Sequence, residues 1–101
     1  MSWALYAIQA LKQGQTITIT PKGSSMEPKI KSGGKVTLIP CDPKTLDRGD
    51  IVLVRVNGKD YLHLIKGIKK GQVLIGNNKG HINGWASIEN VFGKVTKIER
   101  G

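Results

Sequence analysis

The dipeptide Asn57-Gly58 constrains the fold of this chain more than any other short stretch. It separates two runs rich in apolar residues, DIVLVRV before it and KDYLHLI after it. Both residues of an Asn-Gly pair tolerate the positive φ angles of a type I′ turn, so the pattern is the strongest short-range signal for a β-hairpin. The sequence therefore predicts two antiparallel strands joined by a two-residue turn.

The two-residue loop also predicts the register of the hairpin. Val56 faces Lys59, and counting back from the turn places Val52 opposite His63. Because side chains alternate along a strand, His63 shares its face with apolar neighbours. These are Val52, Val54, Tyr61 and Ile65. The other face carries Ile51, Leu53, Leu62 and Leu64, with Arg55 opposite Asp60 as a charge pair. Both faces are apolar, which predicts a hairpin buried on two sides.

The rest of the chain reads as further short strands and turns. Strands are predicted at residues 15–20, at 35–40, from a turn at Gly71 to Ile75, and at 91–99, with a loop over 77–87. The first residues predict a short amphipathic helix that ends at Gly14. Its apolar stripe runs from Trp3 through Leu5 or Tyr6 to Ile8 and Leu11. We therefore expect one mainly β domain over residues 1–101, with a helix at 1–14 and a β region at 15–101.

Composition narrows the function classes without choosing one. The chain has 101 residues and a formal net charge of +9, which favours contact with nucleic acid, anionic membranes or acidic proteins. The lysines and arginines are scattered, which equally fits simple solubility. The single Cys41 cannot form an internal disulfide, and a lone thiol fits a reducing cytoplasm. No stretch is long and apolar enough for a spanning helix, so we expect a cytoplasmic protein without a transmembrane segment.

The stretch GSSMEPKI at residues 23–30 raises the question of a nucleophile. A serine is a weak nucleophile and needs a base within hydrogen-bond reach. His63 is the natural candidate, because imidazole titrates near pH 6.5 and accepts a proton at neutral pH. The plainer interpretation is a polar loop in which Met26 packs and the serines cap, with His63 as a hydrogen-bonded core histidine.

An ordered set of motifs resembles the superfamily of type I signal peptidases and self-cleaving phage-type repressors. SSMEP is similar to its Ser-Met-x-Pro box, DRGDIV to its Gly-Asp-hydrophobic-Val box, and YLHLIKGI to the strand that carries its general base. IGNNKGHINGW and VFGKV resemble its C-terminal region, so the likeness spans roughly residues 17–98. It implies a mainly β fold of coiled sheets, here with one short N-terminal helix.

The resemblance also implies roles for individual residues. Ser25 aligns with the nucleophile, and Ser24 and Met26 with the substrate and oxyanion region. His63 stands where most bacterial members have Lys, which resembles the archaeal and endoplasmic-reticulum branch. That branch orients the imidazole with an Asp, where this chain offers Asn77, Asn78 and Asn83. A Ser25–His63 dyad, a triad completed by Asn77 or Asn83, and an inactive site all stay open.

Three functions follow as hypotheses. The first is a serine endopeptidase that cleaves a peptide or protein substrate. The second is an inactive binding module on the same fold, of phage or mobile-element origin, that uses its basic surface to hold protein or nucleic acid. The third is direct nucleic-acid binding with steep salt dependence. No cofactor is expected, and no metal, because His81 and His63 lack further ligands at metal-binding spacing.

Overall fold

The computed structural model describes residues 3–21, 26–31 and 33–99, and the predicted hairpin lies at its centre. Strand β3 (Ile51–Val56) pairs with β4 (Lys59–Lys69) from Val56 opposite Lys59 to Ile51 opposite Leu64. Asn57 and Gly58 both have positive φ angles, of 51° and 80°. The hairpin and its register are confirmed, including the pairing of His63 with Val52.

Within the described residues, seven strands form one antiparallel sheet in the order β1-β2-β7-β3-β4-β5-β6. The remaining strands are β1 (Ile17–Ile19), β2 (Lys35–Pro40), β5 (Gln72–Gly76), β6 (Ile82–Ser87) and β7 (Val91–Glu99). Short 3-10 helices, η1 (Pro43–Thr45) and η2 (Ile88–Asn90), precede β3 and β7.

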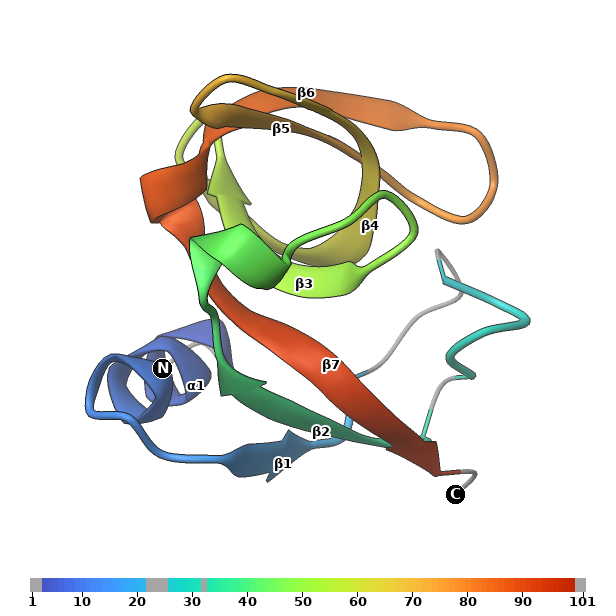
Figure 1. Cartoon of the computed structure of the whole chain (residues 1–101). Coiled ribbons are helices and arrows are strands. Elements are labelled where there is room, and N and C mark those ends of the chain that lie inside the picture. Colours follow the sequence, from blue (N-terminus) through green and yellow to red (C-terminus); the bar gives the residue numbers. More distant parts are fainter. Residues whose placement is uncertain (1–2, 22–25, 32, 100–101) are drawn as a thin grey trace.

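The sheet is strongly coiled. In Figure 1, strands β3 to β6 curl round on themselves, while β1, β2 and β7 extend to one side with helix α1 (Trp3–Lys12) against them. The coil brings β6 into contact with β3. A Cβ atom placed on Gly84 of β6 would lie only 3.6 Å from Cγ1 of Val56 on β3. The expected fold class, mainly β with coiled sheets and one short N-terminal helix, is confirmed.

The hairpin divides two hydrophobic cores, as its two apolar faces predict. One face contributes Ile51, Leu53, Leu62 and Leu64 to a cluster shared with α1 and β2. The other contributes Val52, Val54, Val56 and Ile65 to a cluster inside the coil, with Val73, Ile75 and Ala86 from β5 and β6. His63 lies on this second face and is only 8% exposed. The coil therefore encloses a titratable ring among aliphatic side chains.

The buried face of α1 differs from the expected stripe. Ala4, Ala7, Ile8 and Leu11 are buried, whereas Leu5 and Tyr6 are 42% and 67% exposed. The expectation that the stripe passes through Leu5 or Tyr6 was wrong. Small alanine side chains let the helix lie close to the sheet, where a Cβ on Gly93 would be only 2.6 Å from Leu11 Cδ1. The side chain of Trp3 lies outside the described residues.

The loop expected over residues 77–87 is also partly wrong, because Ile82–Ser87 forms strand β6. This segment lacks the alternation of apolar residues that identifies a strand, and Ala86 is its buried position. Its place in the sheet comes from pairing with β5, with Leu74 opposite Trp85 and Val73 opposite Ala86. The strand thus depends on the coil of the sheet rather than on its own sequence pattern.

Candidate active site

His63 reaches the interior of the coil from the middle of β4. Its partner across the hairpin is Val52, which in turn faces Lys94 on β7. The Tyr61 ring stacks on the imidazole, with ring centroids 5.0 Å apart and an interplanar angle of 28°. The ring is thereby stacked against an aromatic neighbour, on the hairpin face that contributes to the second core.

A bulge in β6 directs Asn83 toward this ring. Ile75 pairs with Gly84 and Gly76 with Ile82, so Asn83 is the extra residue on the β6 side. Gly84 has a φ of +132°, a conformation that residues with a side chain rarely adopt. Bulges of this kind re-aim a side chain. Here the result is a contact of 2.7 Å between Asn83 Oδ1 and His63 Nδ1.

This contact determines which imidazole nitrogen carries the proton. An amide oxygen only accepts hydrogen bonds, so His63 Nδ1 donates its N–H to Asn83 Oδ1. In a neutral imidazole the other nitrogen, Nε2, then has the lone pair and is the basic one. Asn83 therefore holds the tautomer that a general base needs.

The same surroundings keep the ring neutral. Burial among apolar side chains lowers the pKa of His63 below its ordinary value near 6.5, and Coulombic repulsion from nearby His81 lowers it further. The hydrogen bond to Asn83 raises the pKa, but the desolvation effect is larger. At neutral pH His63 is thus an uncharged base.

The other two asparagines of the region organise the loop before β6. Asn77 Oδ1 accepts hydrogen bonds from the backbone N–H groups of Lys79 and His81, at 2.8 and 2.9 Å. Asn78 Nδ2 donates to the carbonyl oxygen of Glu27 at 2.9 Å. Of the two candidates for the third member, Asn83 lies against His63, while Asn77 closes the loop.

The bond from Asn78 ties the loop to the segment that follows the serines. Ser24 and Ser25 lie outside the described residues. Met26, the next residue, is 5% exposed and packs in the first core with Ile30 from the same segment. The 26–31 segment is therefore anchored at both Met26 and Glu27, and Asn78, which the sequence analysis named without a role, is a further functional candidate. Its signal was the second Asn of the NNK stretch, to which the family resemblance gives no role of its own.

The DRGD stretch fixes the start of the hairpin. Gly49 has a φ of +93° and its N–H donates to the carbonyl of Ile65 at 2.8 Å, while Ile65 N–H donates to the carbonyl of Asp50 at 2.9 Å. The Asp50 carboxylate accepts from the N–H of Asp47 at 2.8 Å and pairs with Lys94 Nζ at 3.3 Å. These bonds extend the β3–β4 register beyond Ile51 and so help to fix His63 in place.

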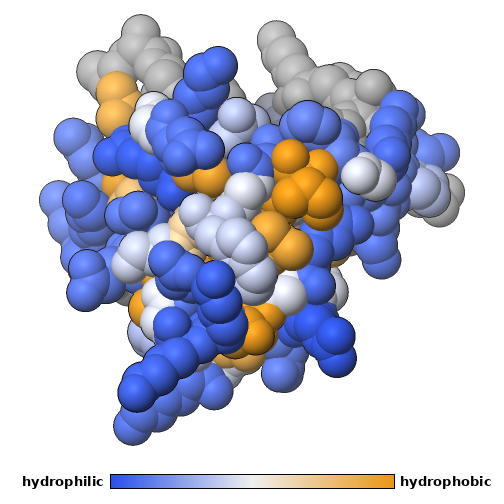
Figure 2. Space-filling view, turned by 90° about the horizontal axis from the view of Figure 1, so that it is seen from above, coloured by the Kyte–Doolittle hydropathy of each residue, from blue (hydrophilic) through white to orange (hydrophobic). Residues whose placement is uncertain are grey.

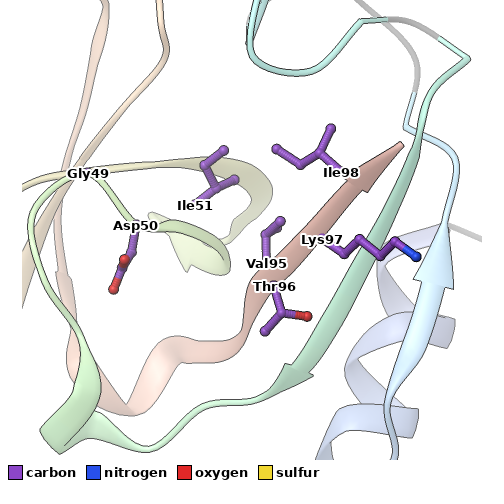
Figure 3. A pocket seen from close by; sticks show the side chains of 7 residues that line it. All are labelled: Gly49, Asp50, Ile51, Val95, Thr96, Lys97 and Ile98. Atoms are coloured by element: carbon purple, nitrogen blue, oxygen red, sulfur yellow. The ribbon is translucent and has the colours of Figure 1, made fainter. Parts of the chain in front are cut away.

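A hollow of about 280 Å³ lies between the start of β3 and the C-terminal half of β7. Figure 3 shows the side chains of Ile51, Val95 and Ile98 pointing toward the same space, while Lys97 extends away from it. Ile51 precedes Val52, the partner of His63, but faces the first core. The hollow is thus a concavity of mixed polar and apolar lining on the face of β3 opposite to the imidazole.

Several other predicted features can be placed. His81 is exposed in the loop before β6. Cys41 is half-buried beside the second core, and burial raises its pKa, which suits a structural thiol. Across residues 3–21, 26–31 and 33–99, no group of three His, Cys, Asp or Glu side chains is arranged to hold a metal ion. Among these same residues no helix has the length and apolar character needed to cross a bilayer.

Comparison with known protein families assigns the chain to a family. The family model described as Peptidase S24-like matches residues 3–95, which is nearly the whole chain. The chain belongs to the Peptidase S24-like family. No curated protein sequence matches it. Membership in the S24-like family confirms the resemblance drawn from the SSMEP, DRGDIV and YLHLIKGI motifs, and it indicates a peptidase or repressor-type function.

Proposed function

We propose that this S24-like chain is a serine endopeptidase in which Ser25 is the nucleophile, His63 the general base and Asn83 the residue that positions the base. The observation that carries the proposal is the 2.7 Å contact between Asn83 Oδ1 and His63 Nδ1. It supports a neutral ring whose Nε2 is basic, inside an apolar enclosure. A core histidine with only a packing role has no need of a bulge and a positive-φ glycine to present its partner.

The proposed reaction is acyl transfer through a serine ester. His63 Nε2 takes the hydroxyl proton while Ser25 Oγ attacks the peptide carbonyl, and backbone N–H groups near Ser24 and Ser25 stabilise the oxyanion. The tetrahedral intermediate collapses, the C–N bond breaks, and the departing amine receives the proton from His63. Water then repeats the sequence on the ester and releases the acid. The substrate is a peptide segment of another protein or of this chain.

Anchoring of the 26–31 segment supports the assignment of Ser25. The Asn78 side chain joins Glu27 to the loop that leads into β6, and β6 supplies Asn83. The segment next to the serines and the residue that holds the imidazole are therefore linked through one loop. This link explains why an Asn-rich stretch follows β5.

A serine-directed fluorophosphonate probe tests the nucleophile without knowledge of the substrate. We expect the probe to label Ser25, as located by peptide mass spectrometry, and labelling to vanish in Ser25→Ala but to persist in the matched control Ser24→Ala. His63→Gln should slow labelling by at least about 10²-fold, the usual contribution of a general base. The rate should fall as pH drops through a midpoint below about 6.5, because burial lowers the pKa of His63. Labelling that is flat with pH, or unaffected by His63→Gln, contradicts the proposal.

A second candidate is an inactive binding module that uses its basic surface, and the neutral Asn83 favours it. A carboxylate at this position would stabilise the imidazolium that forms during catalysis, and Asn cannot. In the chymotrypsin-type triad, changing the Asp to Asn lowers turnover roughly 10⁴-fold, in that case because the imidazole takes the wrong tautomer.

Asn83→Asp separates the two candidates, with Asn77→Asp as its matched control. If the site is catalytic, Asn83→Asp raises both the probe-labelling rate, by at least about tenfold, and the pKa of His63, whereas Asn77→Asp leaves both unchanged. If neither the native chain nor Asn83→Asp is labelled at Ser25 in folded protein, the binding module is the correct function.

A further inference from the structure

The outer face of the coil carries an apolar surface over β4, β5 and β6. Gly67, Leu74 and Trp85 stand side by side on three neighbouring strands. A Cβ on Gly67 would lie 3.7 Å from Trp85 Cη2, so the indole extends across the sheet over the glycine. Even so, Trp85 is 41% exposed. A large aromatic side chain therefore reaches across the neighbouring strands and is still partly exposed to solvent.

Ile82 continues this surface along β6. It pairs with Gly76 and is 47% exposed. The side chains of Ile82 and Lys66 meet over this glycine, because a Cβ there would be 3.0 Å from Ile82 Cδ1 and 3.1 Å from Lys66 Cε. The β4 bulge between Ile65 and Gly67 places Lys66 at this position. An exposed isoleucine is thus bordered by the aliphatic part of a lysine.

A second lysine borders the indole. Lys69 Nζ lies 4.2 Å from the centre of the Trp85 ring, a cation–π contact. We call this set of residues the outer patch: Lys66, Lys69, Leu74, Ile82 and Trp85. Figure 2, which looks down on the top of Figure 1, shows hydrophobic side chains near the middle of this face with hydrophilic ones around them. None of the five is acidic, so the patch combines apolar area with positive charge.

We propose that the outer patch docks the protein on the surface of an anionic lipid bilayer. Trp at the level of the headgroups, aliphatic side chains just below them and lysines that reach up to phosphates are the elements of interfacial binding. The net charge of +9 attracts the chain to an anionic surface over a distance, and lysines near that surface each add affinity. The patch lies on the outside of a coiled sheet, so it is a convex surface suited to a planar partner (Figure 1).

The composition of the patch favours lipid over single-stranded nucleic acid. Nucleic-acid platforms present open aromatic faces on which bases stack. In this patch Lys69 Nζ already lies over the one aromatic ring, and the neighbouring Ile82 and Leu74 have no π surface to offer. The patch can therefore bind through burial of apolar side chains and through its positive charge, and a bilayer interface uses both.

Co-sedimentation of the full chain with vesicles tests the proposal. We expect binding to phosphatidylcholine vesicles that contain phosphatidylglycerol and much weaker binding to pure phosphatidylcholine vesicles. Lys69→Gln should weaken binding about fivefold, the equivalent of about 1 kcal/mol for one charge near an anionic surface. Ile82→Ser should weaken it about tenfold. Ile98→Ser on β7, which changes a side chain of similar exposure outside the patch, is the matched control and should bind like the native chain.

Trp85 provides a second measurement that does not depend on a substitution in the patch. In a Trp3→Phe background, its fluorescence should shift to shorter wavelength when anionic vesicles are added. Equal binding to neutral and anionic vesicles, equal losses for Ile82→Ser and Ile98→Ser, or an unshifted emission would overturn the proposal. Stronger binding to a single-stranded oligonucleotide than to the anionic vesicles would also overturn it. Ser25→Ala should sediment like the native chain, so the outcome is independent of the peptidase proposal.

Discussion

His63 couples the proposed chemistry to the stability of the protein. Burial lowers its pKa in the folded state, so the unfolded chain binds the proton more tightly than the folded one. The stability that follows from a neutral His63 is fully present above the unfolded pKa of about 6.5. It is lost as the pH falls from there toward the lower folded pKa.

This linkage predicts that the free energy of unfolding decreases as pH falls below about 6.5, and that His63→Gln flattens this part of the curve. Urea titrations of both proteins at a series of pH values measure it. His81→Gln is the control, because it changes an exposed imidazole whose charge is only the last of the influences on the His63 pKa. Parallel pH curves for the native chain and His63→Gln would show that the buried ring does not have the lowered pKa.

For individual residues, the sequence identified some members of the candidate site and not others. His63 could be placed on an apolar face from alternation alone, because Asn57-Gly58 fixes the register locally. The choice of Asn83 over Asn77 could not be made, because it depends on a bulge between β5 and β6 that arises from three-dimensional pairing. The role of Asn78 could not be predicted for the same reason, since its partner Glu27 lies 51 residues away along the chain.

Among the secondary-structure elements, those with a pattern in their own sequence were predicted, and those that depend on contacts with distant residues were not. The β3–β4 hairpin and the closing strand β7 follow from apolar alternation and turn residues. Strand β6 contains two polar residues, a glycine and a single buried residue, so only its neighbour β5 and the coil define it. The buried side of α1 was misjudged because alanine contributes little apolar weight, although small side chains are what close packing requires.

The contact between α1 and the sheet is a testable case of that close packing. A Cβ on Gly93 would lie 2.6 Å from Leu11 Cδ1 and 2.9 Å from the carbonyl oxygen of Ile39. Leu11 can move, but the Ile39 carbonyl belongs to the backbone of β2, so Gly93→Ala should lower the free energy of unfolding by about 1–3 kcal/mol. Gly67→Ala on β4 is the matched control, because the nearest atom to its added Cβ would be 3.6 Å away. Equal stability of the two variants, measured by urea unfolding, would contradict tight packing of α1 on β7.

For the whole molecule, repulsion among the excess positive charges destabilises the compact folded state. Sixteen Lys and Arg residues face seven Asp and Glu residues in a body of about 36 × 32 × 25 Å. Ion pairs such as Arg55–Asp60 and Lys94–Asp50 neutralise individual sites, but seven carboxylates are too few to neutralise sixteen basic side chains. The screening length is about 30 Å at 0.01 M salt and about 8 Å at 0.15 M. At low salt every charge therefore interacts with charges across the entire protein, and the excess of positive charge makes the sum repulsive. At higher salt each charge interacts only with its neighbours.

The melting temperature should accordingly rise when sodium chloride is increased from about 0.01 M to about 0.15 M. A double variant, Lys31→Glu with Lys70→Glu, provides the control, because both lysines are exposed and each reversal lowers the net charge by two. It should melt at a higher temperature than the native chain at low salt and respond less to added salt. Binding to anionic vesicles should show the opposite trend and weaken with salt, since screening removes the attraction to the bilayer along with the repulsion within the chain. A native chain whose melting temperature falls over this range would mean that attractive ion pairs, rather than the excess of lysines, dominate its electrostatics.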